Sequence, residues 1–288
     1  MVNNKPVFGV YEKALRLRSL EKLFDTAASC GYATFELSLD STDQRMARLD
    51  WNAAERQAVR NAASNSGIKL LTTCLSGGKR YPLGSSNLEL VHKGLEMTEK
   101  AIALCGDLGI RVIQLSGFDV YDQEPRTAET QKRYVENLFQ CVQMAEKACV
   151  TLAIEPVEGN LLAVRDTMQV IRAINSCWLQ LYPDVANINS LGIDPIRELP
   201  YGAGHIVAVH MRDSIIDCYD ATIPFGTGCL DFEGVFRQLA DMKFCGPLVV
   251  EMWNTEAPDD RERIIQARTY MEQCIEKVRE QHVGSGKG

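Results

Sequence analysis

Four residues of metal-binding type each close an apolar segment in the second half of the chain. Glu155 follows Thr-Leu-Ala-Ile and Asp184 follows Leu-Gln-Leu-Tyr-Pro, while His210 follows Ile-Val-Ala-Val and Glu251 follows Leu-Val-Val. An unpaired carboxylate at the end of a buried strand is costly, and a shared cation offsets that cost. Together, the four side chains predict one metal-binding site.

The spacing of these residues is that of successive strand–helix units. They are separated by 29, 26 and 41 residues, so each interval has room for one helix and the next strand. For any one of them a hydrogen-bonded structural role is the commoner outcome, but four in succession favour a metal site. Three carboxylates and one imidazole suit a single Mn²⁺, Zn²⁺, Co²⁺ or Mg²⁺ ion, and the residue types do not distinguish among these metals.

Short apolar, β-branched segments alternate with longer amphipathic segments along the whole chain. This pattern predicts strands at 7–11, 33–39, 69–76, 111–117, 151–157, 179–186, 206–213 and 247–253. It predicts helices near 20–29, 53–66, 88–108, 129–148, 167–175, 195–199, 232–242 and 259–281. A glycine precedes several of the strands, as expected where a helix has just ended: Gly31, Gly67, Gly109 and Gly246.

Eight such units predict an α/β protein with the (β/α)8 TIM barrel fold. A barrel of this kind takes roughly 250 residues, so we expect residues 1–288 to form a single domain, with a short flexible C-terminal tail at 284–288. An open doubly wound sheet would carry a glycine-rich turn after its first strand, but Tyr-Glu-Lys-Ala stands at 11–14. Barrel enzymes place catalytic residues at the C-terminal ends of their strands, where the four candidate ligands are expected.

The charge balance argues against nucleic acid as a partner. The chain has 31 Lys and Arg against 38 Asp and Glu, and the resulting net charge of −7 would repel a phosphate backbone. No segment approaches the roughly 20 consecutive apolar residues of a membrane helix, and residues 1–7 do not have the pattern of a secretion signal. We therefore expect a cytoplasmic protein without a membrane partner.

Several longer blocks resemble a known family. They include Gly-Val-Tyr-Glu-Lys-Ala-Leu at 9–15, Arg-Tyr-Pro-Leu-Gly-Ser at 80–85 and Glu-Met-Trp at 251–253, with further blocks at 47–51, 112–115 and 204–210. Through these blocks the chain resembles the xylose-isomerase-like barrels. Within that group it closely resembles the bacterial L-ribulose-5-phosphate 3-epimerases, also called L-xylulose-5-phosphate 3-epimerases.

The resemblance implies a metal-dependent 3-epimerase of a ketopentose 5-phosphate, acting on L-ribulose 5-phosphate and L-xylulose 5-phosphate. In that family the residues matching Glu155, Asp184, His210 and Glu251 bind one divalent metal ion. The resemblance also implies that Glu155 and Glu251 are catalytic. One would remove the proton at C3 and the other would return a proton to the opposite face, through a cis-enediolate.

Side chains near the expected strand ends are candidates to bind this small-molecule sugar phosphate. Glu158 and Asn187 lie three residues beyond Glu155 and Asp184 and are candidates for the sugar hydroxyls. Four cations that follow strands are candidates for the phosphate: Lys13, Lys79, Arg80 and Arg212. The chain departs from the family's usual residues at 76–79 and 156–160, which leaves the particular sugar open.

Other functions on the same scaffold remain as alternatives. An epimerase or isomerase of an unphosphorylated ketose or of hydroxypyruvate would use the same metal site. A non-catalytic sugar-binding barrel would need no proton transfer. An endonuclease-IV-like DNA repair enzyme would need many more histidines than the four in this chain. For the enzyme we expect a homo-oligomer, with a dimer as the leading form.

Overall fold

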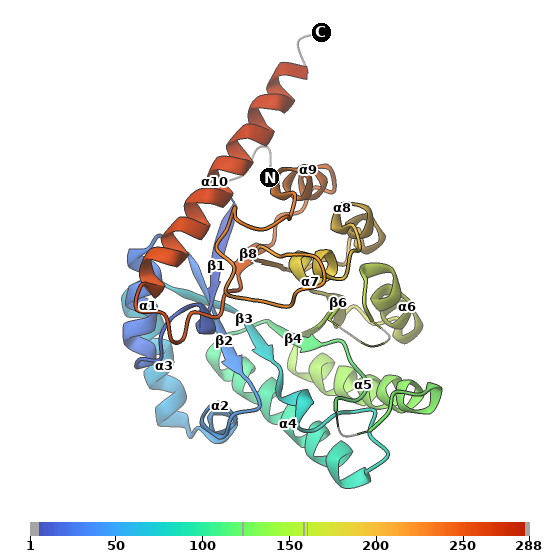
Figure 1. Ribbon diagram of the computed structural model, residues 1–288. Coiled ribbons are helices and arrows are strands. Elements are labelled where there is room, and N and C mark those ends of the chain that lie inside the picture. Colours follow the sequence, from blue (N-terminus) through green and yellow to red (C-terminus); the bar gives the residue numbers. More distant parts are fainter. Residues whose placement is uncertain (1–5, 123, 158, 160, 286–288) are drawn as a thin grey trace.

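Eight parallel strands form a barrel at the centre of the molecule, surrounded by helices (Figure 1). The computed structural model describes residues 6–122, 124–157, 159 and 161–285. The strands are β1 (Val7–Tyr11), β2 (Thr34–Leu39), β3 (Lys69–Leu75), β4 (Val112–Ser116), β5 (Thr151–Glu155), β6 (Leu179–Leu181), β7 (Val209–Met211) and β8 (Pro247–Val250). Hydrogen-bonded neighbours follow the order β6-β5-β4-β3-β2-β1-β8-β7. The predicted TIM barrel is confirmed.

The barrel closes between β6 and β7 through isolated backbone contacts. Parallel bridges join Leu181 to Ile206 and Asp184 to His210. The backbone N–H of His210 also donates to the carbonyl of Pro183 at 2.9 Å. Two of the four predicted metal ligands therefore lie directly on the closing seam.

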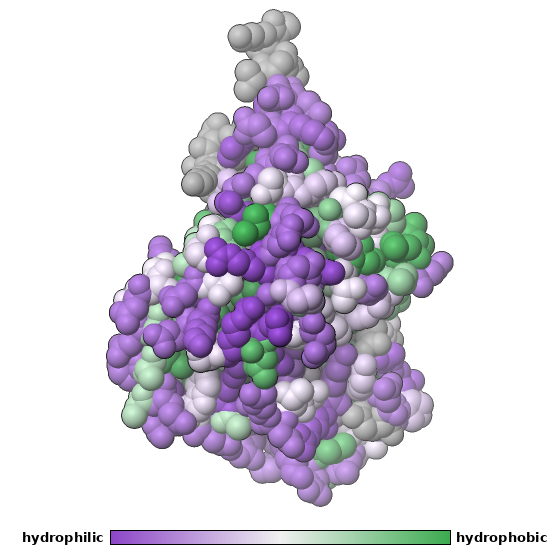
Figure 2. Space-filling model, turned by 60° about the vertical axis from the view of Figure 1, so that its left-hand side comes forward, coloured by the Kyte–Doolittle hydropathy of each residue, from purple (hydrophilic) through white to green (hydrophobic). Residues whose placement is uncertain are grey.

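Most of the described helices bury apolar residues against the outside of the barrel. The helices are α1 (Leu20–Ser29), α2 (Asp43–Met46), α3 (Ala53–Ser66), α4 (Leu88–Leu108), α5 (Ala128–Ala148), α6 (Val164–Ile174), α7 (Val185–Ser190), α8 (Pro195–Glu198), α9 (Phe232–Asp241) and α10 (Asp260–Ser285). Figure 1 shows that α10 continues well beyond the barrel at its C-terminal end. The surface shown in Figure 2 is mostly hydrophilic, as expected when the apolar faces of helices turn inward. No helix in the described part of the chain is long and apolar enough to cross a membrane.

All strands except β1 are shorter than the sequence pattern predicts, and β6 and β7 differ most from the prediction. The strand predicted at 179–186 ends at Leu181, because Asp184 caps α7, which begins at Val185. The strand predicted at 206–213 is regular only over Val209–Met211. Apolar residues lie beyond both regular strands, at 182–183 after β6 and at 206–208 before β7, so the pattern does not reveal where the regular backbone begins or ends.

The inside of the barrel is filled by a few large side chains opposite small ones. Tyr11 and Tyr182 are fully buried there, together with Cys74, Ala153 and Ala208. The two alanines leave room for the two tyrosine rings, as is usual in the packed interior of a small barrel. The interior is therefore filled by side chains, and a substrate could bind only at an open end of the barrel.

A buried carboxylate ties the ends of β1 and β2 together. Glu12, in the 3-10 turn η1 (Glu12–Ala14), accepts hydrogen bonds from Nη1 and Nη2 of Arg48 at 2.6 and 2.7 Å. It also accepts from the backbone N–H of Ser38 at 3.0 Å. Burial acts to raise the pKa of Glu12, but the hydrogen bonds and charge of Arg48 hold it below its usual value.

Replacing Glu12 with Gln should destabilise the barrel. The change leaves the Arg48 cation buried without its anion, and breaking a buried ion pair from one side costs about 3–5 kcal/mol. Urea unfolding of the purified variant would measure the loss. Glu89→Gln is the matched control, because Glu89 pairs with Lys93 on the exposed surface of α4 and its loss should leave stability unchanged. Equal stabilities for the two variants would contradict the role of Glu12.

Candidate metal centre

The four predicted ligands meet at the C-terminal end of the barrel. Glu155 is the last residue of β5, Asp184 is the N-cap of α7, His210 lies in β7, and Glu251 directly follows β8. One ligand atom from each lies within 4.8 Å of the others, and all four residues are buried. The tertiary structure thus brings together the residues that the strand-end pattern selects.

The orientation of His210 leaves one ring nitrogen facing the cluster. Its Nε2 atom lies 2.7 Å from Oε1 of Glu36, and the Tyr182 hydroxyl donates to the other oxygen of Glu36 at 2.7 Å. Its Nδ1 atom lies 3.1 Å from Oε1 of Glu155 and 3.2 Å from Oε2 of Glu251. A metal-binding histidine commonly donates its second nitrogen to a carboxylate, so Nδ1 is the nitrogen available to a metal.

The crowded acidic groups of the cluster favour the binding of a cation. Burial, with the neighbouring charge of Glu155, raises the pKa of Glu251 to about 8. Burial likewise raises the pKa of Glu155. Asp184 differs, because the charge of Arg212 holds its pKa below the usual value despite its burial. Three crowded carboxylates with one imidazole nitrogen form a donor set in which a divalent ion would relieve the repulsion.

Neutral and cationic side chains hold the carboxylates in place. Asp184 accepts from the backbone N–H of Ala186 at 2.7 Å through Oδ1 and from Nε of Arg212 at 2.9 Å through Oδ2. Arg212 also donates to Oδ1 of Asn187, whose Nδ2 donates to Glu155 at 3.3 Å. Arg212, a predicted substrate contact, is thus buried inside the centre, where it pairs with Asp184.

Two positioning residues were missed by the sequence reasoning. Gln114, on β4, donates through Nε2 to Oε2 of Glu155, and Glu36, on β2, holds His210. Each lies between two apolar residues of its strand, and both are buried. A polar residue between apolar neighbours in a strand is a signal for such a residue, but neither stands at the end of a strand, where barrels place their catalytic residues.

A pocket of about 390 Å³ adjoins the centre through Asn187. That size lies in the range of small-molecule sites. Lys79 lies in the lining, where Nζ is 3.3 Å from the Tyr121 hydroxyl and 4.6 Å from the centre of its ring. The lining is made by Lys79, Tyr121, Val157, Asn187, Ser190, Leu191, Asp217, Cys218 and Tyr219. Two predicted substrate contacts, Lys79 and Asn187, therefore share one pocket.

The other predicted substrate contacts lie elsewhere. Arg80 pairs with Asp43 at 2.5 Å and lines a different pocket between α2 and α4. Lys13 pairs with Asp40 at 3.0 Å, and its Nζ lies 5.0 Å from the centre of the Trp253 ring. Glu158 lies outside the described residues.

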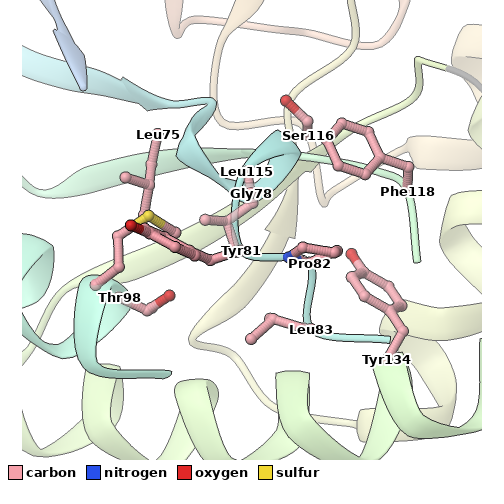
Figure 3. A pocket seen from close by; sticks show the side chains of 11 residues that line it. Leu75, Gly78, Tyr81, Pro82, Leu83, Thr98, Leu115, Ser116, Phe118 and Tyr134 are labelled. Atoms are coloured by element: carbon pink, nitrogen blue, oxygen red, sulfur yellow. The ribbon is translucent and has the colours of Figure 1, made fainter. Parts of the chain in front are cut away.

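A third pocket lies beside the 3-10 turn that contains Gly78 (Figure 3). Leu75, Leu83 and Phe118 are among the mainly apolar side chains around it, and Gly78 lies at its edge. Its volume of about 30 Å³ is far below that of a small-molecule site. This cavity is therefore not a candidate site for a sugar.

The Glu36–His210 contact predicts a measurable effect on metal binding. Glu36→Gln should weaken Mn²⁺ binding by about 10–100-fold, because it removes the anion that orients the histidine ring. Calorimetric titration of the metal-free protein would measure this. Glu198→Gln is the control, because Glu198 is equally buried but pairs with Arg165 outside the barrel. Metal affinity that falls equally in both variants would count against a specific role for Glu36.

Comparisons with known proteins identify the family of this chain and several relatives. A model of the xylose isomerase-like TIM barrel family matches residues 24–274. The chain is 39% identical over 281 residues to L-ribulose-5-phosphate 3-epimerase UlaE of Escherichia coli O157:H7 (strain EC4115 / EHEC), covering 96% of this chain and 98% of that protein. The UlaE protein of Shigella sonnei (strain Ss046) matches with the same identity and coverage.

Solved structures share the fold at lower sequence identity. An L-ribulose 3-epimerase superposes with a TM-score of 0.78 at 20% identity, covering 96% of this chain and 97% of that one. A D-psicose 3-epimerase in the presence of D-fructose gives a TM-score of 0.79 at 15% identity, covering 93% and 99%. The resemblance seen in the sequence is confirmed. The chain belongs to the xylose isomerase-like TIM barrel family, with the L-ribulose-5-phosphate 3-epimerases among its relatives.

Proposed function

We propose that this protein is a metal-dependent 3-epimerase that interconverts L-ribulose 5-phosphate and L-xylulose 5-phosphate. The observation that carries the proposal is the buried cluster of Glu155, Asp184, His210 and Glu251 beside a pocket that contains a lysine. The relatives at 39% identity, which are named for this reaction, support the same substrate class.

The metal would be held by the three carboxylates and Nδ1 of His210. A divalent cation bound there would polarise the ketose carbonyl and so make the hydrogen on the neighbouring carbon more acidic. Epimerisation at C3 needs that proton removed from one face and a proton returned to the other. The chain must therefore present two proton-transferring groups to opposite sides of the bound sugar.

Glu155 and Glu251 suit these two roles by their positions. They come from β5 and β8, three strands apart around the barrel, so they approach the space between them from different sides. Gln114 and Asn187 hold Glu155 through one hydrogen bond to each of its oxygens. In this proposal one glutamate removes the C3 proton and the other supplies a proton, and the roles exchange in the reverse reaction.

Lys79 is the proposed partner of the phosphate. It lines the same pocket as Asn187, whose side chain contacts Glu155. A sugar placed with its reacting carbons at the metal centre could direct its phosphate along this pocket towards the lysine. A fixed ammonium group is a common partner for such an anion.

The function is tested by a screen of ketose 5-phosphates in D₂O with added Mn²⁺ or Zn²⁺. Deuterium should enter C3 of L-ribulose 5-phosphate and L-xylulose 5-phosphate, and the signal should vanish after chelation. Sustained turnover in protein shown by elemental analysis to be metal-free would refute the metal-dependent mechanism. Deuterium at C1 instead would indicate an isomerase that moves the carbonyl group.

Replacing each proposed catalytic glutamate should show which face of the sugar that glutamate serves. Glu155→Gln and Glu251→Gln keep the side-chain shape, but an amide cannot accept a proton at neutral pH, so each should lose at least about 100-fold in turnover. Each variant should still wash deuterium into one epimer, and the preferred epimer should differ between the two. Variants that bind metal but exchange both epimers equally would show that one base serves both faces.

Lys79 and its neighbour Arg80 form a natural pair of test and control. Lys79→Ala should raise KM for the phosphorylated ketose at least about tenfold more than for its unphosphorylated analogue, because only the former places an anion at this site. Arg80→Ala should change neither value, since Arg80 pairs with Asp43 in a separate pocket. A Lys79 effect that is equal for both sugars would favour an epimerase of unphosphorylated ketoses.

A further inference from the structure

The loop between β7 and α9, residues 212–231, is held by one buried carboxylate. Asp213 accepts through Oδ1 from the backbone N–H groups of Ser214 at 2.8 Å and Leu230 at 3.3 Å. Through Oδ2 it accepts from those of Gly226 at 2.8 Å and Gly228 at 2.9 Å. The two ends of the loop are thus joined through a single side chain, which uses both of its oxygens.

The fit around Asp213 is close enough to require glycine. A Cβ atom on Gly228 would stand 2.3 Å from Oδ1 of Asp213 and 2.5 Å from the carbonyl oxygen of Ser214. Gly226 has a φ of 84°, a backbone conformation that other residues rarely adopt. The sequence of the loop is therefore adapted to bring its backbone amides onto this carboxylate.

Two backbone hydrogen bonds hold the middle of the loop, one to each side of the metal centre. The backbone N–H of Asp217 donates to the carbonyl of Ser190, at the end of α7, at 2.7 Å. On the other side, the backbone N–H of Trp253, two residues after Glu251, donates to the carbonyl of Ala221 at 2.9 Å. The segment between these two contacts is consequently fixed across the opening of the barrel.

Tyr219 lies on this segment. It lines the pocket beside Cys218, and the guanidinium carbon of Arg212 lies 4.9 Å from the centre of its ring. Its ring also meets that of Trp253 edge to face, with centroids 6.0 Å apart. The Tyr219 residue remains 55% exposed, so the ring forms an outer wall of the pocket while contributing little to the core.

We propose that Asp213 is a positioning residue that acts through Tyr219, and that Tyr219 limits which substrates the pocket admits. Asp213 holds the loop, the loop places the tyrosine ring as one wall of the pocket, and the ring confines the sugar chain between the metal centre and Lys79. The part that concerns substrate binding rests on the proposed epimerase function. The part that concerns the loop does not.

Hydrogen exchange of the substrate-free protein tests the hold on the loop. In the wild type the amides of Gly226 and Gly228 should exchange slowly although they lie in a loop. Asp213→Asn has one acceptor oxygen and an NH₂ group that would face backbone donors, so exchange across residues 214–230 should accelerate at least about tenfold. Asp231→Asn is the control, because Asp231 caps α9 through Gly234 and asparagine caps equally well. Fast exchange in the wild type, or equal exchange in the two variants, would overturn the role of Asp213.

A double-mutant cycle tests the connection to Tyr219. Tyr219→Ala should raise KM for the best substrate of the ketose screen about tenfold while kcat changes less than about threefold, and Tyr219→Phe, which keeps the ring, should leave KM within about twofold. If Asp213 acts through this ring, the double variant with Asp213→Asn should have the KM of Tyr219→Ala alone, whereas independent residues would have additive effects. Additive effects, or an unchanged KM in Tyr219→Ala, would overturn the proposal. A wild type inactive on every ketose would count against the epimerase function alone, since the exchange experiment needs no substrate.

Discussion

Three carboxylates buried around one histidine at the end of the barrel impose the main constraint on this structure. Glu155, Asp184 and Glu251 each bring a carboxyl group into a region from which water is largely excluded, where a negative charge is costly. Such charges are tolerated only where partners compensate them. Arg212 supplies one positive charge through Asp184, and a divalent cation is the partner that matches the remaining donors in number and type.

The polar groups around the centre follow from that constraint. Because the carboxylates must be held apart and oriented, Gln114 and Asn187 donate to Glu155, and Glu36 holds the far nitrogen of His210. Arginine has only donors, so Asn187 must turn its oxygen to Arg212 and its NH₂ group to Glu155. The Asn187 amide therefore links the position of Arg212 to that of Glu155, the proposed catalytic base.

The fold places these groups where the barrel is closed by short contacts and not by long strand pairing. The Asp184–His210 bridge joins β6 to β7 at the metal centre itself, and the chain turns there into α7. The segments that follow β3, β4, β5 and β7, together with α7, line the adjoining pocket. In such an arrangement the strand ends hold the candidate ligands while loops line the pocket. Changes in the loops can then alter which substrate binds without altering the metal centre.

The sequence by itself determined the barrel and selected the four candidate metal ligands, because both depend on patterns that are local along the chain. Strands and helices alternate with a clear period, and the parallel order of strands brings residues at their C-terminal ends to one rim, as for Glu155 and Glu251. Only the tertiary structure separated Lys79 from Arg80, since neighbouring cations on a 3-10 turn point into different pockets. It likewise decided that Glu36 contacts a histidine 174 residues further along the chain. Contacts between distant segments depend on the direction of each side chain in the closed barrel, and a linear pattern carries no record of that direction.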